Sequence, residues 1–255
     1  MSLALSHAFR NQTTAPNGRV AVEPVAKRIR VRFAGEVIAD TMNALLLLER
    51  DHLPVYYLPL ADIRAEFLKA VDTISFCPWK GTARYWDVVV GDRRAADAVW
   101  SYPEAHEGAL DLSGYAAFYW NRVDEWYEED ERVSVHPRDP YVRVDVLRSS
   151  RHVKASIGDT VLAESRDTWM LFETGQPPRF FFPRIGVVTG ELTHSETVSA
   201  SPYLGTARHL AYRTTEGELQ DVAWFYVEST PEAAALADLV TFDLDRVTIC
   251  DEDDD

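Results

Sequence analysis

Cysteine is scarce in this chain. Its 255 residues include only 2 cysteines, Cys77 and Cys250, which are too few to build a disulfide framework. The sequence also has no Cys-x-x-Cys pair and no clustered spacing of His and Cys, so we expect no structural zinc or other metal site. A chain with few cysteines suits a reducing compartment, and the predicted location is the cytoplasm.

Long apolar runs are missing as well. The longest, Tyr115 to Trp120 and Val222 to Val227, are far shorter than a membrane-spanning helix. The first 17 residues carry no hydrophobic secretory core, and they predict a polar, flexible leader. We therefore expect no membrane as a partner.

Positive charge is also in short supply. Lys and Arg together number 26 against 41 Asp and Glu, which gives a formal net charge of -15. Such a surface repels phosphate backbones, and the basic cluster from Lys27 to Arg30 leads into a predicted strand, so we expect no nucleic-acid partner. The run from Asp251 to Asp255 predicts a solvated acidic tail.

An internal repeat is the most informative feature that the sequence does contain. A shift of 124 residues brings the second half into register with the first without a gap. A period this long indicates two paired domains, because solenoid repeats are much shorter. The coinciding residues include Pro78 and Pro202, Gly81 and Gly205, Arg84 and Arg208, Asp97 and Asp221, Trp100 and Trp224, and Arg122 and Arg246.

The repeat divides the chain into four parts. We predict a leader over residues 1–17, a first copy over 18–130, a linker over 131–141, and a second copy with the acidic tail over 142–255. Charge and proline clusters disfavour regular structure in the linker. A fused duplicate can inherit the interface of a homodimer, so we expect a monomer with pseudo-twofold related domains, or a weak homodimer.

Each copy reads as a series of short strands separated by turn residues. Proline followed by Ala and Glu favours short helical segments over Pro103 to Leu112 and Pro231 to Leu239, while 61–70 is predicted to be a turn. The fold class is therefore mainly β, with each copy a small antiparallel sandwich or partly closed barrel. In the first copy, the predicted strands cover 29–33, 37–40, 45–49, 55–58, 82–90, 96–102 and 115–123.

Charged and aromatic side chains gather at the predicted strand ends. Alternation places Arg84 at the rim of an apolar face, and it aligns Trp100 and Tyr102 with Glu104. One interpretation is a partly buried ion pair between Arg84 and Glu49 or Glu104. The other is a pocket for a small anionic or aromatic molecule, because guanidinium offers a rigid fork of donors to carboxylate or phosphate. The predicted ligand-binding residues are Glu49, Tyr57, Lys80, Arg84, Trp100, Tyr102 and Glu104.

The turn before the strand at 82–90 differs between the copies. Cys77 and Lys80 of the first copy are replaced by Ser201 and Leu204 in the second, so any chemistry of the first pair belongs to that copy alone. A nearby lysine favours the thiolate form of a cysteine, which makes Cys77 and Lys80 catalytic candidates. The alternative is an inert buried cysteine beside a solvated lysine.

Cys77-Pro78, Lys80-Gly81 and Ala117-Phe118-Tyr119, with Gly35 and Ile38-Ala39-Asp40, carry a resemblance to a known family. The first copy resembles the bacterial and fungal family catalogued as domain of unknown function 427, and the second copy resembles it more weakly. The family also bears a nucleotidyltransferase-like label, which implies nucleotidyl or phosphoryl transfer.

Motifs that would support such a transfer are few. The sequence holds no Walker A, G-x-G-x-x-G or G-x-S-x-G motif, and Asp243-Leu244-Asp245 is the one obvious D-x-D outside the tail. The cofactor is unknown. Three hypotheses follow: a module that binds a small molecule, an enzyme acting by group transfer or by thiol chemistry at Cys77, and an interaction scaffold.

Overall fold

The chain folds into two compact units, Met1–Asp139 and Pro140–Asp255. The computed structural model describes residues 13–14, 19–104, 107–215 and 217–252. In these residues both units consist mainly of antiparallel sheets with short 3-10 turns, and no closed barrel forms, which confirms the mainly β tandem fold. Of the predicted leader, Thr13 and Thr14 form a short strand, and 1–12 and 15–17 lie outside the described residues.

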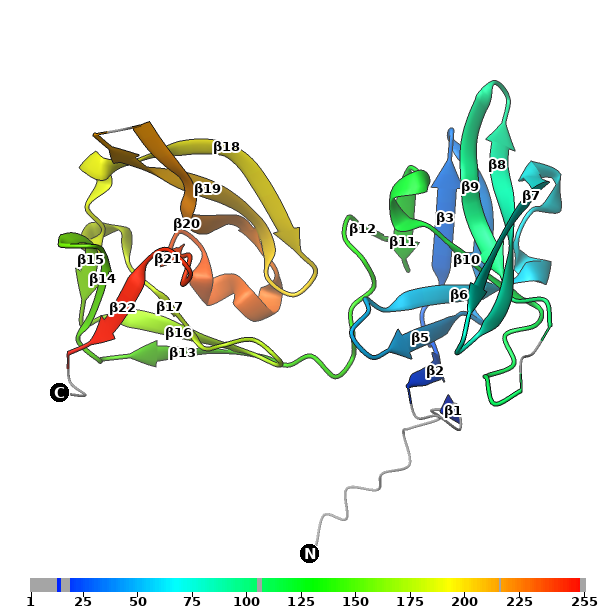
Figure 1. Cartoon of the computed structure of the whole chain (residues 1–255), viewed down its shortest axis with the longest axis horizontal. Coiled ribbons are helices and arrows are strands. Elements are labelled where there is room, and N and C mark those ends of the chain that lie inside the picture. Colours follow the sequence, from blue (N-terminus) through cyan, green and yellow to red (C-terminus); the bar gives the residue numbers. More distant parts are fainter. Residues whose placement is uncertain (1–12, 15–18, 105–106, 216, 253–255) are drawn as a thin grey trace, which may run out of the picture. The chain divides into compact units, whose positions relative to one another are not determined.

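The first unit contains two sheets (Figure 1). An eight-stranded sheet has the order β1-β2-β5-β6-β10-β9-β8-β7, and a four-stranded sheet has the order β12-β11-β3-β4. Short 3-10 turns η1 (Leu60–Asp62), η2 (Ala65–Phe67) and η3 (Trp120–Arg122) connect some of the strands. The strands are β1 (Thr13–Thr14), β2 (Val20–Pro24), β3 (Ile29–Phe33), β4 (Glu36–Thr41), β5 (Leu45–Glu49), β6 (Val55–Pro59), β7 (Leu68–Cys77), β8 (Gly81–Val90), β9 (Arg93–Ser101), β10 (Tyr115–Phe118), β11 (Glu125–Glu128) and β12 (Glu131–Val133).

The second unit repeats this order. Its sheets are β13-β16-β17, β18-β19-β20-β21 and β15-β14-β22, and the bridge between Phe182 and Val240 joins the first two as β6 joins β10. The turns are η4 (Arg184–Gly186), η5 (Thr189–Glu191) and η6 (Pro231–Leu236). The strands are β13 (Val144–Ser149), β14 (Val153–Ile157), β15 (Thr160–Ser165), β16 (Thr168–Glu173), β17 (Arg179–Phe181), β18 (Leu192–Ser201), β19 (Gly205–Thr214), β20 (Gly217–Ser229), β21 (Val240–Phe242) and β22 (Thr248–Asp251).

The large sheet of the first unit is buried on both faces around β6. Leu58 of β6 packs with β3 in the core between the two sheets, whereas its neighbour Tyr57 packs on the opposite face beneath Leu110 and Leu112. Successive residues of a strand point to opposite faces, so both must be apolar where both faces are covered. Burial of each large side chain contributes about 1.5–3 kcal/mol.

The repeated arginine and aspartate have a structural reason. Asp97 adopts a positive φ of 47°, and the Arg122 guanidinium donates to its carbonyl oxygen at 2.8 Å. In the second unit Asp221 has a φ of 59°, and Arg246 donates to the carbonyl of the preceding Gln220. Each arginine therefore satisfies backbone carbonyls at a kink in the strand, which explains why both copies keep it.

The repeated glycine in the β7–β8 and β18–β19 turns is also required by the backbone. Gly81 and Gly205 have φ values of 100° and 108°, where other residues are strained. A Cβ atom on Gly205 would lie 1.9 Å from the carbonyl oxygen of Glu228. These residues belong to the shared fold.

Three expectations about local structure are corrected. The described residues of Pro103 to Leu112 form bends and turns instead of a helix, whereas the segment predicted over Pro231 to Leu239 does contain a short helix, the 3-10 helix η6. Strands β7 and β18 were not predicted, and in both a register shift interrupts the strand alternation. Residues 131–133, expected to be irregular linker, form β12, which pairs with β11.

The C-terminal end of the described chain differs from the predicted tail. Asp251 lies in β22 and forms an ion pair with Arg151 at 3.2 Å, so the predicted solvated tail begins inside a strand. Residues 253–255 lie outside the described residues.

No helix in the described part of the chain is long and apolar enough to cross a membrane.

Candidate binding pocket

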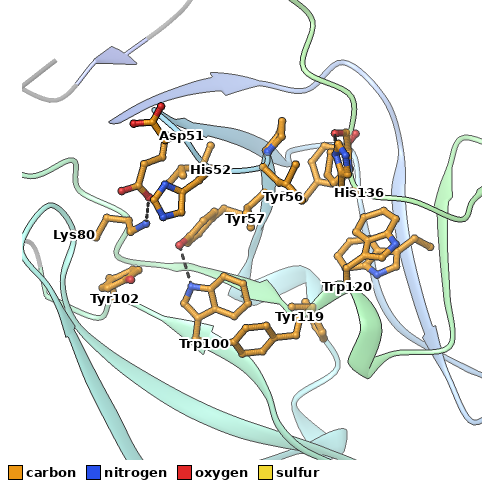
Figure 2. A pocket seen from close by; sticks show the side chains of 18 of the residues that line it. Asp51, His52, Tyr56, Tyr57, Lys80, Trp100, Tyr102, Tyr119, Trp120 and His136 are labelled. Atoms are coloured by element: carbon orange, nitrogen blue, oxygen red, sulfur yellow. Dashed lines mark hydrogen bonds and ion pairs between the residues drawn. The ribbon is translucent and has the colours of Figure 1, made fainter. Parts of the chain in front are cut away.

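A cavity of about 590 Å³ opens in the first unit (Figure 2). Its walls come from the β5–β6 hairpin, from β8, β9 and β10, and from the segments that follow β10 and β12. Aromatic side chains form much of the surface, and they are Tyr56, Tyr57, Tyr85, Trp100, Tyr102, Phe118, Tyr119, Trp120 and Trp126. The other lining residues are Leu47, Glu49, Asp51, His52, Leu53, Pro54, Val55, Lys80, His136 and Pro137.

The aromatic rings hold one another in place. The centre of the Tyr119 ring lies 4.6 Å from that of Trp100, and Trp120 stacks on Trp126 at 4.4 Å with an angle of 4° between the planes. Trp100 also donates from Nε1 to the hydroxyl of Tyr57 at 3.1 Å. Contacts of this kind fix ring orientations, so the cavity has firm apolar walls with hydroxyl groups set into them.

A buried ion pair closes one end of the cavity. Lys80 donates from Nζ to Oε2 of Glu49 at 2.5 Å, and the two side chains are only 13% and 6% exposed. Arg19 lies farther away, with its Nε 3.9 Å from Oε1 of Glu49. Figure 2 shows Lys80 beside Tyr102 at this end, and His136 beside Trp120 at the other. The ammonium charge of Lys80 is therefore already offset by a carboxylate.

Burial affects the tyrosine hydroxyls of the site. It raises the pKa of Tyr57 well above its ordinary value and raises the pKa of Tyr102, with smaller contributions from the nearby acidic groups Cys77 and Glu49. Burial also raises the pKa of Tyr56, whose hydroxyl donates to Glu128 at 2.7 Å. All three phenols are therefore neutral at pH 7 and act through hydrogen bonds.

Two histidines line the cavity, and each contacts a backbone carbonyl through Nδ1. The Nδ1 atom of His52 lies 3.0 Å from the carbonyl oxygen of Arg50, and that of His136 lies 2.8 Å from the carbonyl oxygen of Pro137. In a neutral ring these bonds keep the proton on Nδ1.

The structure brings most of the predicted ligand-binding residues together. Glu49, Tyr57, Lys80, Trp100 and Tyr102 all line the cavity. Ligand binding by these residues stays a prediction.

Arg84 and Glu104 do not join this group. Arg84 is exposed, while its neighbours Ala83 and Tyr85 face inward, so the predicted face of β8 was the wrong one. A register shift between Trp86 and Val88 explains the error, because a bulge reverses the alternation and makes Val88 core although Arg84 is not. Glu104 is exposed beyond the end of β9, and Glu49 pairs with Lys80 instead of Arg84.

Cys77 lies next to the site without lining it. Its side chain is half-buried against the cluster that contains Tyr57 and Tyr102, and both it and the exposed Cys250 are free thiols. The backbone N–H of Lys80 donates to the carbonyl of Cys77 at 3.2 Å, which closes the turn.

Several lining residues were missed at the sequence level. Trp120, Trp126 and His136 come from segments after β10 whose strand pairing the alternation did not predict. A usable signal was present, because Tyr119 and Trp120 differ from their counterparts Asp243 and Leu244 in the second copy.

The second unit arranges the corresponding residues differently. Arg179 stands where the first copy has Val55, and its guanidinium lies 4.7 Å from the ring centre of Trp224. The same guanidinium donates to the carbonyl oxygen of Phe242 at 2.8 Å. Leu204, in place of Lys80, is buried. A side chain of the protein therefore lies against the residues whose counterparts line the first cavity.

Hydrophobic side chains are also exposed on the first unit. Ile74 and Phe76 of β7, at the edge of the large sheet, are 63% and 64% exposed.

In the described residues no group of three His, Cys, Asp or Glu side chains is placed to hold a metal ion.

Comparison with known proteins gives one finding for both copies. Residues 21–129 and 145–253 each match a family described as a domain of unknown function, DUF427. A search of curated proteins gives no match. The two matched ranges lie at equivalent places in the repeat and together cover most of the chain.

Proposed function

We propose that in this chain, which belongs to the DUF427 family, the first copy binds a small planar aromatic molecule in its cavity. The observation that carries this proposal is the aromatic wall around about 590 Å³ of open space. Ligand sites are typically concave, mainly apolar and supplied with a few polar groups that orient the ligand, and this cavity has each property.

Stacking and edge contacts with the wall supply the affinity. A planar ring that enters the cavity meets Trp100, Tyr119 and Trp120, whose orientations are already fixed by their neighbours. Aromatic pairs of this kind add about 0.5–1.5 kcal/mol beyond the burial of area. Because the rings are preorganised, little side-chain entropy is lost on binding.

The polar end of the cavity orients the ligand. Lys80, Glu49 and the Tyr102 hydroxyl lie together there and offer both donors and acceptors. Recognition of an anion has less support than recognition of a ring, because Glu49 already offsets Lys80 and Arg84 lies outside the cavity.

Saturation-transfer NMR with indole, a neutral planar probe, tests this proposal on the full chain. We expect transfer from the native protein to indole and its loss in Val55→Arg, which places in the first copy the residue that the second copy has at this position. Ile74→Arg is the matched control, since it adds the same side chain at an exposed site of the same unit.

Indole binding that survives Val55→Arg, or that disappears equally in Ile74→Arg, contradicts the proposed site. The absence of transfer to the native protein contradicts the function itself.

A further inference from the structure

The second copy contains an internal occupant of the region that corresponds to the cavity. Arg179 begins at the position of the lining residue Val55 and extends across Trp224, the counterpart of Trp100. Its guanidinium ends on the carbonyl oxygen of Phe242, the counterpart of Phe118. The occupant is therefore a planar cation that combines stacking with a hydrogen bond to the backbone.

The two units share the geometry that makes this comparison valid. Tyr85 pairs with Trp100 in the first unit, and His209 pairs with Trp224 in the second, in the same register. Phe118 likewise pairs with Val99 as Phe242 pairs with Ala223. The indole and the backbone carbonyl that hold the guanidinium are consequently present at equivalent places in the first unit.

The electrostatics of the first cavity also favour a cation. Aromatic faces carry a negative quadrupole, and where the second copy has Asp243 the first has Tyr119, whose ring lies 4.6 Å from that of Trp100. Two lining carboxylates, Glu49 and Asp51, face a single lining ammonium, that of Lys80, which Glu49 already holds. A cation therefore meets attractive π faces and the exposed carboxylate of Asp51.

We infer that the ligand of the first cavity is an aromatic or planar organic cation of the amidinium or guanidinium class, seated against Trp100 with its N–H groups toward the Phe118 carbonyl. This inference rests on the proposed function and adds the sign of the charge. The guanidinium of Arg179 is the model for its placement.

Three probes of nearly equal shape separate the effect of ligand charge on affinity from the binding of the aromatic ring itself. Benzamidine is cationic, benzamide is neutral and benzoate is anionic, and each is titrated into the full chain and into Val55→Arg by calorimetry. We expect benzamidine to bind about tenfold more tightly than benzamide, with benzoate weakest, as cation–π attraction predicts. Val55→Arg should abolish the benzamidine signal, because the new guanidinium fills the same place.

Equal binding of benzamidine and benzamide, both lost in Val55→Arg, overturns the inference and leaves the aromatic site standing. Tighter binding of benzoate also overturns it and returns Lys80 to the role of an anion receptor. Binding of none of the three to the native chain removes the proposed function together with the inference.

Discussion

The two copies share the order of their main strands and the arginine that supports the kinked strand, yet they differ in the partners of one glutamate. In the first, Glu49 accepts a hydrogen bond from Lys80 at 2.5 Å. In the second, Leu204 replaces that lysine, and burial raises the pKa of Glu173, with only a partial opposing effect from Arg179. The fold has been kept, while some of the side chains around the cavity, Lys80 and Val55 among them, have been exchanged.

This difference separates structural residues from residues available for function. A position that holds the same residue in both copies, such as Trp100 and Trp224, is required by the fold that the copies share. A position that differs, such as Val55 and Arg179, decides whether a guanidinium lies against the indole. The functional distinction between the copies therefore depends on a few substitutions in a common scaffold.

The largest expected effect comes from removing the ammonium of the first copy. Lys80→Leu, which installs the residue of the second copy, leaves Glu49 buried with Arg19 3.9 Å away. We expect the first unit to lose about 3 kcal/mol at neutral pH, because an uncompensated buried carboxylate is costly. Hydrogen exchange, followed by mass spectrometry on peptides of each unit, measures the loss.

Lys80→Leu combined with Glu49→Gln is the control for this prediction. The double variant removes both charges, so it should recover most of the lost stability. A single variant as stable as the native chain would show that the ion pair does not hold this end of the cavity.

A smaller effect is expected when the occupant of the second copy is removed. Arg179→Val, which installs the residue of the first copy, deletes the contact with Trp224 and the hydrogen bond to Phe242. We expect the second unit to lose about 2 kcal/mol, the combined scale of a cation–π contact and a charged hydrogen bond. Urea unfolding checks the loss, and methylguanidinium at low millimolar concentration should restore part of it, whereas methylammonium should not.

An unchanged unfolding curve for Arg179→Val would mean that the guanidinium adds nothing to the stability of the second copy. Equal rescue by both cations would mean that its planar shape is irrelevant.

The smallest effect concerns the pH dependence of the second copy. Since burial raises the pKa of Glu173, ionisation of this group destabilises the folded state, and the penalty grows as the pH rises from the ordinary value through the raised one. Glu173→Gln should therefore stabilise the second unit at pH 7 by less than about 1 kcal/mol, a discounted figure because the group is partly solvated. Below pH 4 the variant and native proteins should unfold alike. Thermal unfolding of the variant and of the native protein at both pH values checks the sign of the effect. A variant that is less stable than the native protein at pH 7 would contradict the prediction.

Much of the frame could be predicted from the sequence, because the repeat tests each position twice. Gly81 and Gly205 mark a turn that needs a positive φ, and Trp100 and Tyr102 lie on one face as alternation predicts. Glu49 and Lys80 were both predicted to line a pocket, although the predicted partner of Glu49 was Arg84 or none. Local sequence rules suffice where a strand is regular.

The rest could not be predicted, because irregular pairing changes which residues meet. The bulge in β8 reversed the face assigned to Arg84. The last strand also shifts by one residue between the copies, since Val31 pairs with Trp126 whereas Ala155 pairs with Ile249. The gap-free offset of 124 residues aligns Trp126 with Cys250 instead of with Ile249. The comparison of the copies therefore could not identify Trp126 as a lining residue.

The central claim is that the first copy keeps an open aromatic cavity and the second fills the corresponding place with its own arginine. Two-dimensional ¹⁵N NMR of the tryptophan indoles tests it within one molecule, with Trp100→Phe and Trp224→Phe to assign the two key signals. On titration with benzamidine we predict that the Trp100 signal shifts to saturation while the Trp224 signal stays in place. A shift of Trp224 equal to that of Trp100, or a Trp100 signal that does not move, would contradict the account.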